Sequence, residues 1–166
     1  MKNLILPVLL LCFPALVSCA GFSPVYAENS AARKMFPQIS MPSIAGKNGF
    51  LLSQEMQDRG GIHIGESAKY VLRINLTPSR VGFAVRADSV SRRFEIQMDA
   101  YWVLYDERGT VLTSMDARSS TAFDSPSNPY TAQVAEQDAE ARAVAVLADA
   151  ILDQLGFYFA KQADNK

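Results

Sequence analysis

The stretch Phe94-Glu95-Ile96-Gln97-Met98-Asp99-Ala100-Tyr101-Trp102-Val103-Leu104 decides the fold, because apolar residues recur along it at every second position. One set of alternate positions is apolar throughout: Phe94, Ile96, Met98, Ala100, Trp102 and Leu104. The other set begins with three polar residues, Glu95, Gln97 and Asp99. A period of two is the pattern of a strand with one buried face. The stretch therefore predicts a strand in a mostly antiparallel sheet that packs on one side.

The residues upstream of this strand predict further strands. Apolar residues alternate from Tyr70 to Leu76 and again from Val81 to Ala87. Between these runs, Thr77-Pro78-Ser79 has the composition of a turn. The apolar parity then changes before the central strand, so a turn or bulge is expected near Asp88 to Ser91.

The residues downstream predict a hairpin and a long helix. Asp106 to Gly109 has the composition of a hairpin loop, and Thr110 to Phe123 follows as its second strand. After the breaker cluster 125–129, the stretch from Tyr130 to Phe159 contains no proline and no glycine before Gly156. Its apolar residues recur at three- and four-residue steps, which predicts an amphipathic helix: Val134, Ala141, Val144, Ala148, Ile151 and Leu155.

The N-terminal part of the domain completes the fold class. Residues 36–44 contain two prolines and predict an edge strand or an irregular segment. Phe50 to Arg59 predicts a short amphipathic helix that Gly60-Gly61 ends. The order is then strand, helix, three or four strands, helix. The expected fold is α+β, with two helices on one face of a roughly four-stranded, mostly antiparallel sheet, in a single domain over residues 36–162.

The N-terminus has the features of a lipoprotein signal over residues 1–18. Lys2 precedes a short apolar run, and Leu16-Val17-Ser18-Cys19 resembles the bacterial lipobox, in which the cysteine thiol is lipidated and cleavage precedes it. Residues 19–35 would then form a lipidated tether to the outer membrane. Ordinary signal cleavage after Ala20 or after Ala27 is the alternative.

Composition excludes several classes of function. The net charge of −1 argues against a nucleic-acid-binding protein. Both cysteines, Cys12 and Cys19, lie within the first twenty residues, and His63 is the sole histidine, so no metal site is expected. His63 is interpreted as an ordinary loop or strand residue. Without a nucleophile motif or a phosphate-binding glycine loop, we expect neither an enzyme nor a cofactor.

Charge is unevenly distributed along the chain. Lys69 to Arg93 carries +5, and the segment from Asp124 to the C-terminus carries −4. Arginine suits forked hydrogen bonds with phosphate or carboxylate. In the simpler interpretation these arginines are solvated charges on strands and loops, some of them paired with the acidic helix.

Several short motifs, in order, resemble the LPS-assembly lipoprotein LptE family, especially its alphaproteobacterial type. The start Cys19 to Tyr26 is similar to the family's usual Cys-Gly-Phe-x-Pro-Leu/Val-Tyr, with Ala20 inserted after the cysteine. Further similar positions follow along the chain: Tyr70 and Leu72, Arg93, Tyr105 with Asp106 and Gly109, Tyr130 to Ala132, and Asp138-Ala139.

The resemblance implies a function and a set of sites. It implies a non-catalytic lipoprotein at the periplasmic face of the outer membrane that plugs the LptD β-barrel, assists its assembly and binds lipopolysaccharide (LPS). It places lipidation on Cys19. We expect LPS phosphates to contact Arg86, Arg92 and Arg93. Phe22, Pro24 and Tyr26 are expected to contact either a partner or the chain's own domain.

Two other functions stay open at this point. The first is a lipid-anchored periplasmic adaptor of another envelope machine, such as one that supports a secretin or a cell-wall complex. The second is a small-ligand or hydrolytic lipoprotein, which the missing pairing of nucleophile and base disfavours. A partner that co-purifies stoichiometrically would distinguish the first alternative, and a deep apolar pocket with converging polar groups would favour the second.

Overall fold

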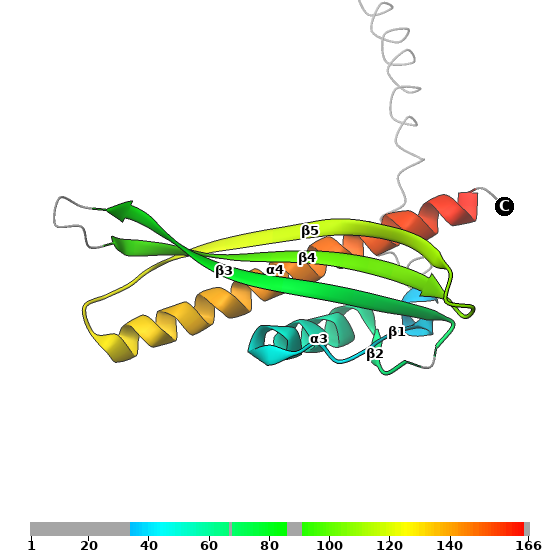
Figure 1. The fold of residues 1–166 in the computed structure, drawn as a ribbon, viewed down its shortest axis with the longest axis horizontal. Coiled ribbons are helices and arrows are strands. Elements are labelled where there is room, and N and C mark those ends of the chain that lie inside the picture. Colours follow the sequence, from blue (N-terminus) through cyan, green and yellow to red (C-terminus); the bar gives the residue numbers. More distant parts are fainter. Residues whose placement is uncertain (1–33, 67, 86–90, 165–166) are drawn as a thin grey trace, which may run out of the picture.

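The computed structural model describes residues 34–66, 68–85 and 91–164, and this part forms one elongated α+β domain (Figure 1). Its elements follow in this order: η2 (Phe36–Gln38), β1 (Ile39–Met41), α3 (Gly46–Gly60), β2 (His63–Ile64), β3 (Tyr70–Val85), β4 (Ser91–Asp106), β5 (Val111–Asp124) and α4 (Pro129–Asp164). The expected fold class, with two helices packed on a mostly antiparallel sheet, is confirmed.

The sheet has five strands in the order β2-β1-β3-β4-β5. The three long strands β3, β4 and β5 are antiparallel neighbours, whereas β1 pairs in parallel with both β2 and β3. The fifth strand, β2, consists of His63 and Ile64 alone. Two residues are too few to show a period, so the expected count of roughly four strands was one short.

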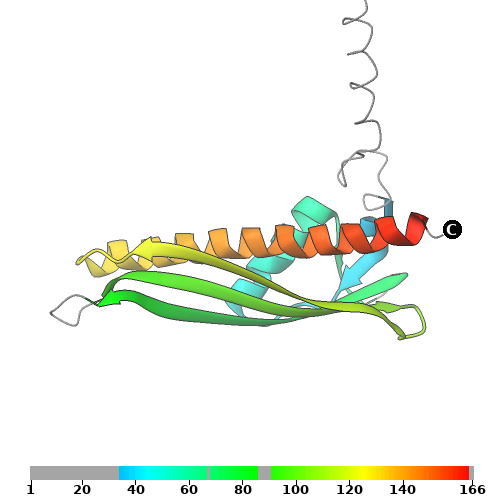
Figure 2. The same cartoon turned by 90° about the horizontal axis from the view of Figure 1, so that it is seen from above.

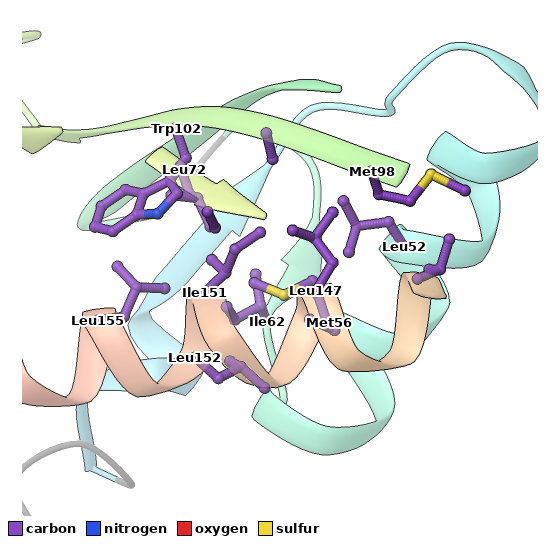
Figure 3. Packing of buried hydrophobic residues seen from close by; sticks show 14 of the residues in the cluster. Leu52, Met56, Ile62, Leu72, Met98, Trp102, Leu147, Ile151, Leu152 and Leu155 are labelled. Carbon is purple, nitrogen blue, oxygen red and sulfur yellow. The ribbon is translucent and has the colours of Figure 1, made fainter. Parts of the chain in front are cut away.

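Both helices lie on the same side of the sheet (Figure 2). The apolar face predicted for β4 is the face they cover, with Met98, Trp102 and Leu104 fully buried. Figure 3 shows Trp102 and Leu72 of the sheet opposite Ile151 and Leu155 of α4. The sequence pattern therefore predicted correctly which side of β4 faces the core.

By length and composition alone, helix α4 contains an 18-residue window apolar enough to cross a membrane. Half of that window is buried within the domain, as in the core helix of a globular protein. Val144, Ala148, Ile151 and Leu155 are buried as predicted, whereas Val134 and Ala141 are exposed. Small side chains let a helix lie close to its neighbours, and three alanines of α4 are fully buried: Ala139, Ala143 and Ala148.

Helix α3 is fixed against α4 by ion pairs and by its C-terminal glycines. Arg59 Nη1 donates to both carboxylate oxygens of Asp149 at 2.8 Å, and Arg59 Nε donates to Glu55 at 2.6 Å. These hydrogen bonds raise the pKa of Arg59, and the bond with Glu55 contributes most. Gly61 ends the helix with φ 67° as predicted. A Cβ at Gly60 would lie 2.6 Å from Leu152, so the helices approach closely there.

The predicted turn at Thr77-Pro78-Ser79 is wrong. β3 runs through it without a break, and Pro78 pairs in register with Met98. Strand β1 covers β3 only at Tyr70 and Val71, so at Pro78 the outer side of β3 is an open edge. An edge tolerates proline because the missing N–H is needed by no neighbouring strand.

The change in apolar parity lies within β3, earlier than expected. Leu72, Ile74 and Leu76 face the helices, whereas Val81 lies on the opposite face and is exposed. Of the expected turn region, Asp88 lies outside the described residues, and Ser91 belongs to β4, where it pairs with Val85.

The domain has two distinct ends (Figure 1). At the entry end, the chain enters at Lys34, α4 ends, and the turn at Asp106–Gly109 joins β4 to β5. We call the opposite end the hairpin end, after the antiparallel pair of β3 and β4. There β3 ends, β4 begins, and α4 starts at Pro129.

Candidate functional site

Basic side chains occupy the hairpin end, where the sequence predicted a phosphate-binding group. Arg93 lies near the start of β4, between Phe83 of β3 and Asp124 of β5 in register, and its side chain is exposed. Arg92 is placed by the structure in β4 without a described side chain, and Arg86 lies outside the described residues. Of the three predicted arginines, Arg93 is thus the one whose side chain can be examined.

Arg80 is a second basic group at this end that the prediction of the site missed. Its guanidinium carbon lies 4.0 Å from the centre of the Phe94 ring and 5.6 Å from that of Phe123. The two rings stack on each other at 5.7 Å. Arg80 Nη1 also forms an ion pair of 3.2 Å with Glu136 of α4. The aromatic rings and the carboxylate together hold this guanidinium in one orientation.

Register explains why Arg80 lies there. It pairs with Ile96 on the face of the sheet that carries the core. The side chain lies beside α4, where it contacts Glu136, and 43% of it is exposed. The signal in the sequence was an arginine on the same parity as Leu72, Ile74 and Leu76. A long aliphatic stem can cover aromatic surface while its charged head reaches water, so the position suits a binding arginine.

The ion pair with Glu136 confirms for Arg80 the simpler interpretation, in which some arginines pair with the acidic helix. Such an exposed pair is weak, about 0–1 kcal/mol, and a ligand phosphate can compete with it. Arg80 and Arg93 are therefore both compatible with an anion-binding role at the hairpin end.

The sheet face away from the helices is polar and open. Asp99 of β4 and Arg118 of β5 form an ion pair across it, and Tyr101 is 48% exposed beside them. These residues, with Thr77, line a hollow of about 490 Å³. The part of the chain that the structure describes places no helix over this face.

A second pocket, of about 460 Å³, lies at the entry end. Its lining includes Lys69, Tyr70, Asp106, Arg108, Tyr158 and Phe159. Asp106 Oδ1 accepts the backbone N–H groups of Thr110 at 2.8 Å and of Arg108 at 2.9 Å. These bonds hold the pKa of Asp106 below its ordinary value, and the bond from Thr110 contributes most.

Residues 36–155 match the family model described as LptE, Lipopolysaccharide-assembly. The chain belongs to the LptE family. The match spans η2 through most of α4, so it includes the hairpin end and leaves residues 1–35 uncovered. The resemblance stated from the short motifs is confirmed.

Solved structures of three lipoproteins share this fold. A lipoprotein of Caulobacter crescentus is 26% identical, with a TM-score of 0.64 over 78% of this chain and 96% of that chain. A minor lipoprotein of Acinetobacter baumannii and lipoprotein B of Nitrosomonas europaea are each 14% identical, with TM-scores of 0.55 and 0.56. They cover 72% and 71% of this chain, and 90% and 81% of their own chains. These two show the shared fold alone. A comparison with curated proteins found no match.

Membership of the LptE family assigns the chain to LPS assembly in a non-enzymatic role. It is consistent with a lipoprotein of the outer membrane. Among the described residues, no group of three or more His, Cys, Asp or Glu could hold a metal ion. His63 is exposed on β2 and pairs with Ser40 of β1. Cys19, Phe22, Pro24 and Tyr26 lie outside the described residues.

Proposed function

We propose that this LptE-family lipoprotein acts as plug and assembly partner of an LptD-like β-barrel and binds LPS during its insertion into the outer leaflet. The observation that carries the proposal is the hairpin end, where Arg80 is oriented by two aromatic rings and Arg93 is exposed. The two arginines are on opposite faces of the sheet, so each would engage a phosphate group separately, and a preoriented guanidinium such as that of Arg80 suits the paired oxygens of such a group.

The open sheet face supports the plug role. The interior of a large membrane barrel is polar, so a domain inside it needs a polar surface and not an apolar one. The Asp99–Arg118 ion pair and the exposed Tyr101 supply such a surface over β4 and β5. Tyrosine and arginine are both enriched at interfaces between proteins.

The lipid anchor belongs to the same proposal. Residues 1–18 act as the signal, Cys19 carries the lipid, and residues 19–35 tether a domain that begins at residue 36. A chain with Cys19→Ala should lose all labelling by a radioactive fatty acid, whereas Cys12→Ala should keep it. Labelling that persists in the Cys19→Ala chain refutes the lipidation site.

LPS binding is tested by charge reversal in the otherwise intact chain. Arg93→Glu should weaken binding of purified LPS about tenfold or more, the effect of losing one charged hydrogen bond of about 1.5–3 kcal/mol. Combined reversal of Arg86, Arg92 and Arg93 should weaken it further. Arg73→Glu is the matched control, because Arg73 is exposed on β3 but lies towards the entry end, over Tyr105.

Two results would contradict LPS binding at the hairpin end. One is unchanged binding by the folded triple variant. The other is an equal loss in the Arg73→Glu control, which would indicate a general charge effect. Circular dichroism and the urea midpoint show whether each variant is folded.

The barrel partner is tested separately. A photo-crosslinking residue at Tyr101, in intact cells, should capture a LptD-like barrel, which should also co-purify stoichiometrically with the unmodified chain. Capture of a different envelope protein in the same ratio would favour the alternative, a lipid-anchored adaptor of another machine.

A further inference from the structure

The pocket at the entry end has an aromatic wall. Tyr70 meets Phe159 edge to face at 5.4 Å, and Phe159 meets Tyr158 at 5.2 Å. Tyr70, Tyr158 and Leu112 are each half-buried, so part of their apolar surface is accessible inside the pocket. Its volume of about 460 Å³ is within the range of binding pockets.

The charges around the pocket cancel. Lys69 and Arg108 are balanced by Asp106 and Glu107. Lys69 already lies 5.4 Å from the centre of the Tyr70 ring, and the Asp106 carboxylate is engaged by the N–H groups of its own turn. An anionic ligand therefore gains little attraction here, and neutral apolar groups fit better.

We propose that this pocket binds the chain's own segment Phe22–Tyr26, which fixes the proposed tether to the domain. The sequence from Ala20 to Ala27, AGFSPVYA, carries no charge, and it contains two aromatic residues and a proline. Aromatic rings pack edge to face against other aromatic rings with about 0.5–1.5 kcal/mol beyond their burial. A neutral aromatic segment thus matches a neutral aromatic wall.

The connection to the domain is short enough for this contact. Seven residues separate Tyr26 from Lys34, the first described residue, and the eight steps between the two span about 26 Å when extended. A few residues later, Ile39 of β1 pairs with Tyr70, which lines the pocket. A short linker gives a tethered segment an effective concentration in the millimolar range, so even weak binding fills the pocket.

The contact would determine where the membrane lies relative to the two ends of the domain. Phe22 is three residues from Cys19, so a bound segment holds the lipid close to the entry end. This consequence rests on the proposed lipidation of Cys19, and the contact itself needs a mature chain that begins before Phe22, which cleavage after Ala27 would remove. LPS binding and the barrel partner are not involved in the contact.

The test is a pair of introduced cysteines in the full mature, lipidated chain, whose own cysteine is blocked by the lipid. Ser23→Cys is combined with Gln162→Cys, which lies on the rim of the pocket, or with Lys161→Cys as the matched control. Lys161 is equally exposed and adjacent, but it does not line the pocket. Under a mild oxidant, the Gln162 pair should form an intramolecular disulfide about tenfold faster.

A further pair of substitutions tests whether the aromatic side chains of the segment make the contact. Replacing both Phe22 and Tyr26 by serine should reduce the rate for the Gln162 pair to that of the control. Equal rates for the two pairs, disulfides between chains, or a rate that survives the serine substitutions would overturn the proposal. A chain that fails to bind LPS or a barrel can still form this disulfide, so failure of the proposed function is distinguishable.

Discussion

Replacing Gln154 by leucine should destabilise the domain by about 1–3 kcal/mol, the cost of a buried polar group left without a partner. Trp102 is fully buried in the core, and its Nε1 donates to Gln154 Oε1 at 2.7 Å. Gln154 Nε2 in turn donates to the backbone oxygen of Asp116 at 3.0 Å. One side chain of α4 thus joins the centre of the sheet to its outer strand.

The two hydrogen bonds should contribute unequally to the loss. Asp116 is exposed on β5, so water replaces the lost donor at its carbonyl at little cost. The indole N–H of Trp102 has no such replacement once leucine covers it. With a urea dependence of about 1.5 kcal/mol per M, the midpoint of unfolding should fall by about 0.7–2 M.

Two variants separate the orphaned donor from altered packing. Gln154→Glu keeps an acceptor for the indole and should lose less stability than Gln154→Leu. In a Trp102→Phe background the donor is absent, so Gln154→Leu should cost about 1 kcal/mol less than in the natural chain. Urea unfolding is followed by circular dichroism at 222 nm, since Trp102 is the sole tryptophan. A Gln154→Leu chain within about 0.5 kcal/mol of the natural one would refute the reasoning.

Substitutions at four other positions test other parts of the domain. Glu136→Gln should cost about 0.5 kcal/mol or less as an exposed pair, whereas Arg80→Ala should cost about 1–2 kcal/mol because the aromatic contact is lost too; equal urea midpoints would contradict this. Gly61→Ala should cost about 1 kcal/mol, because its φ of 67° is left-handed, and Gly61→Asn should cost less by the same measure. Asp106, whose pKa is lowered chiefly by the N–H of Thr110, contributes stability above its ordinary pKa of 3.8 that is lost as the pH falls through the lowered value. In the Asp106→Asn chain, the thermal unfolding midpoint should therefore fall less at acid pH than in the natural chain. An unchanged fall would contradict the stabilising role of the Asp106 carboxylate.

The sequence predicted best the elements whose period is long and unbroken. Eleven residues of β4 alternate without an exception on the buried side, and the structure places that side against the helices. The exposure of Val134 and Ala141 in α4 has two other causes. Val134 precedes Ala139, the first fully buried residue of the helix, whereas Ala141 lies between the buried Ala139 and Ala143 but on the outer side of the helix.

Features that depend on neighbouring strands could not be predicted. Pro78 has the local chemistry of a turn, and only the short reach of β1 makes it acceptable within β3. Arg80 belongs to the helix-facing side because β3 continues through Pro78. A turn at Pro78 would interrupt the alternation of β3. The sequence alone therefore does not show that Arg80 shares a face with Leu76, nor that it contacts aromatic rings at the hairpin end.

The length of the domain connects the two proposals. Helix α4 has 36 residues, about 54 Å at 1.5 Å per residue, and it runs from the hairpin end to the entry end. The apolar band of a membrane barrel is about 25 Å tall, so a domain lying along the barrel axis extends beyond it. A rigid domain held at its entry end by a bound tether would place its arginines at a fixed depth in that barrel. An unbound tether over residues 19–35 would leave that depth undefined by tens of ångströms, so substitutions that release Phe22 and Tyr26 should weaken LPS delivery without weakening LPS binding.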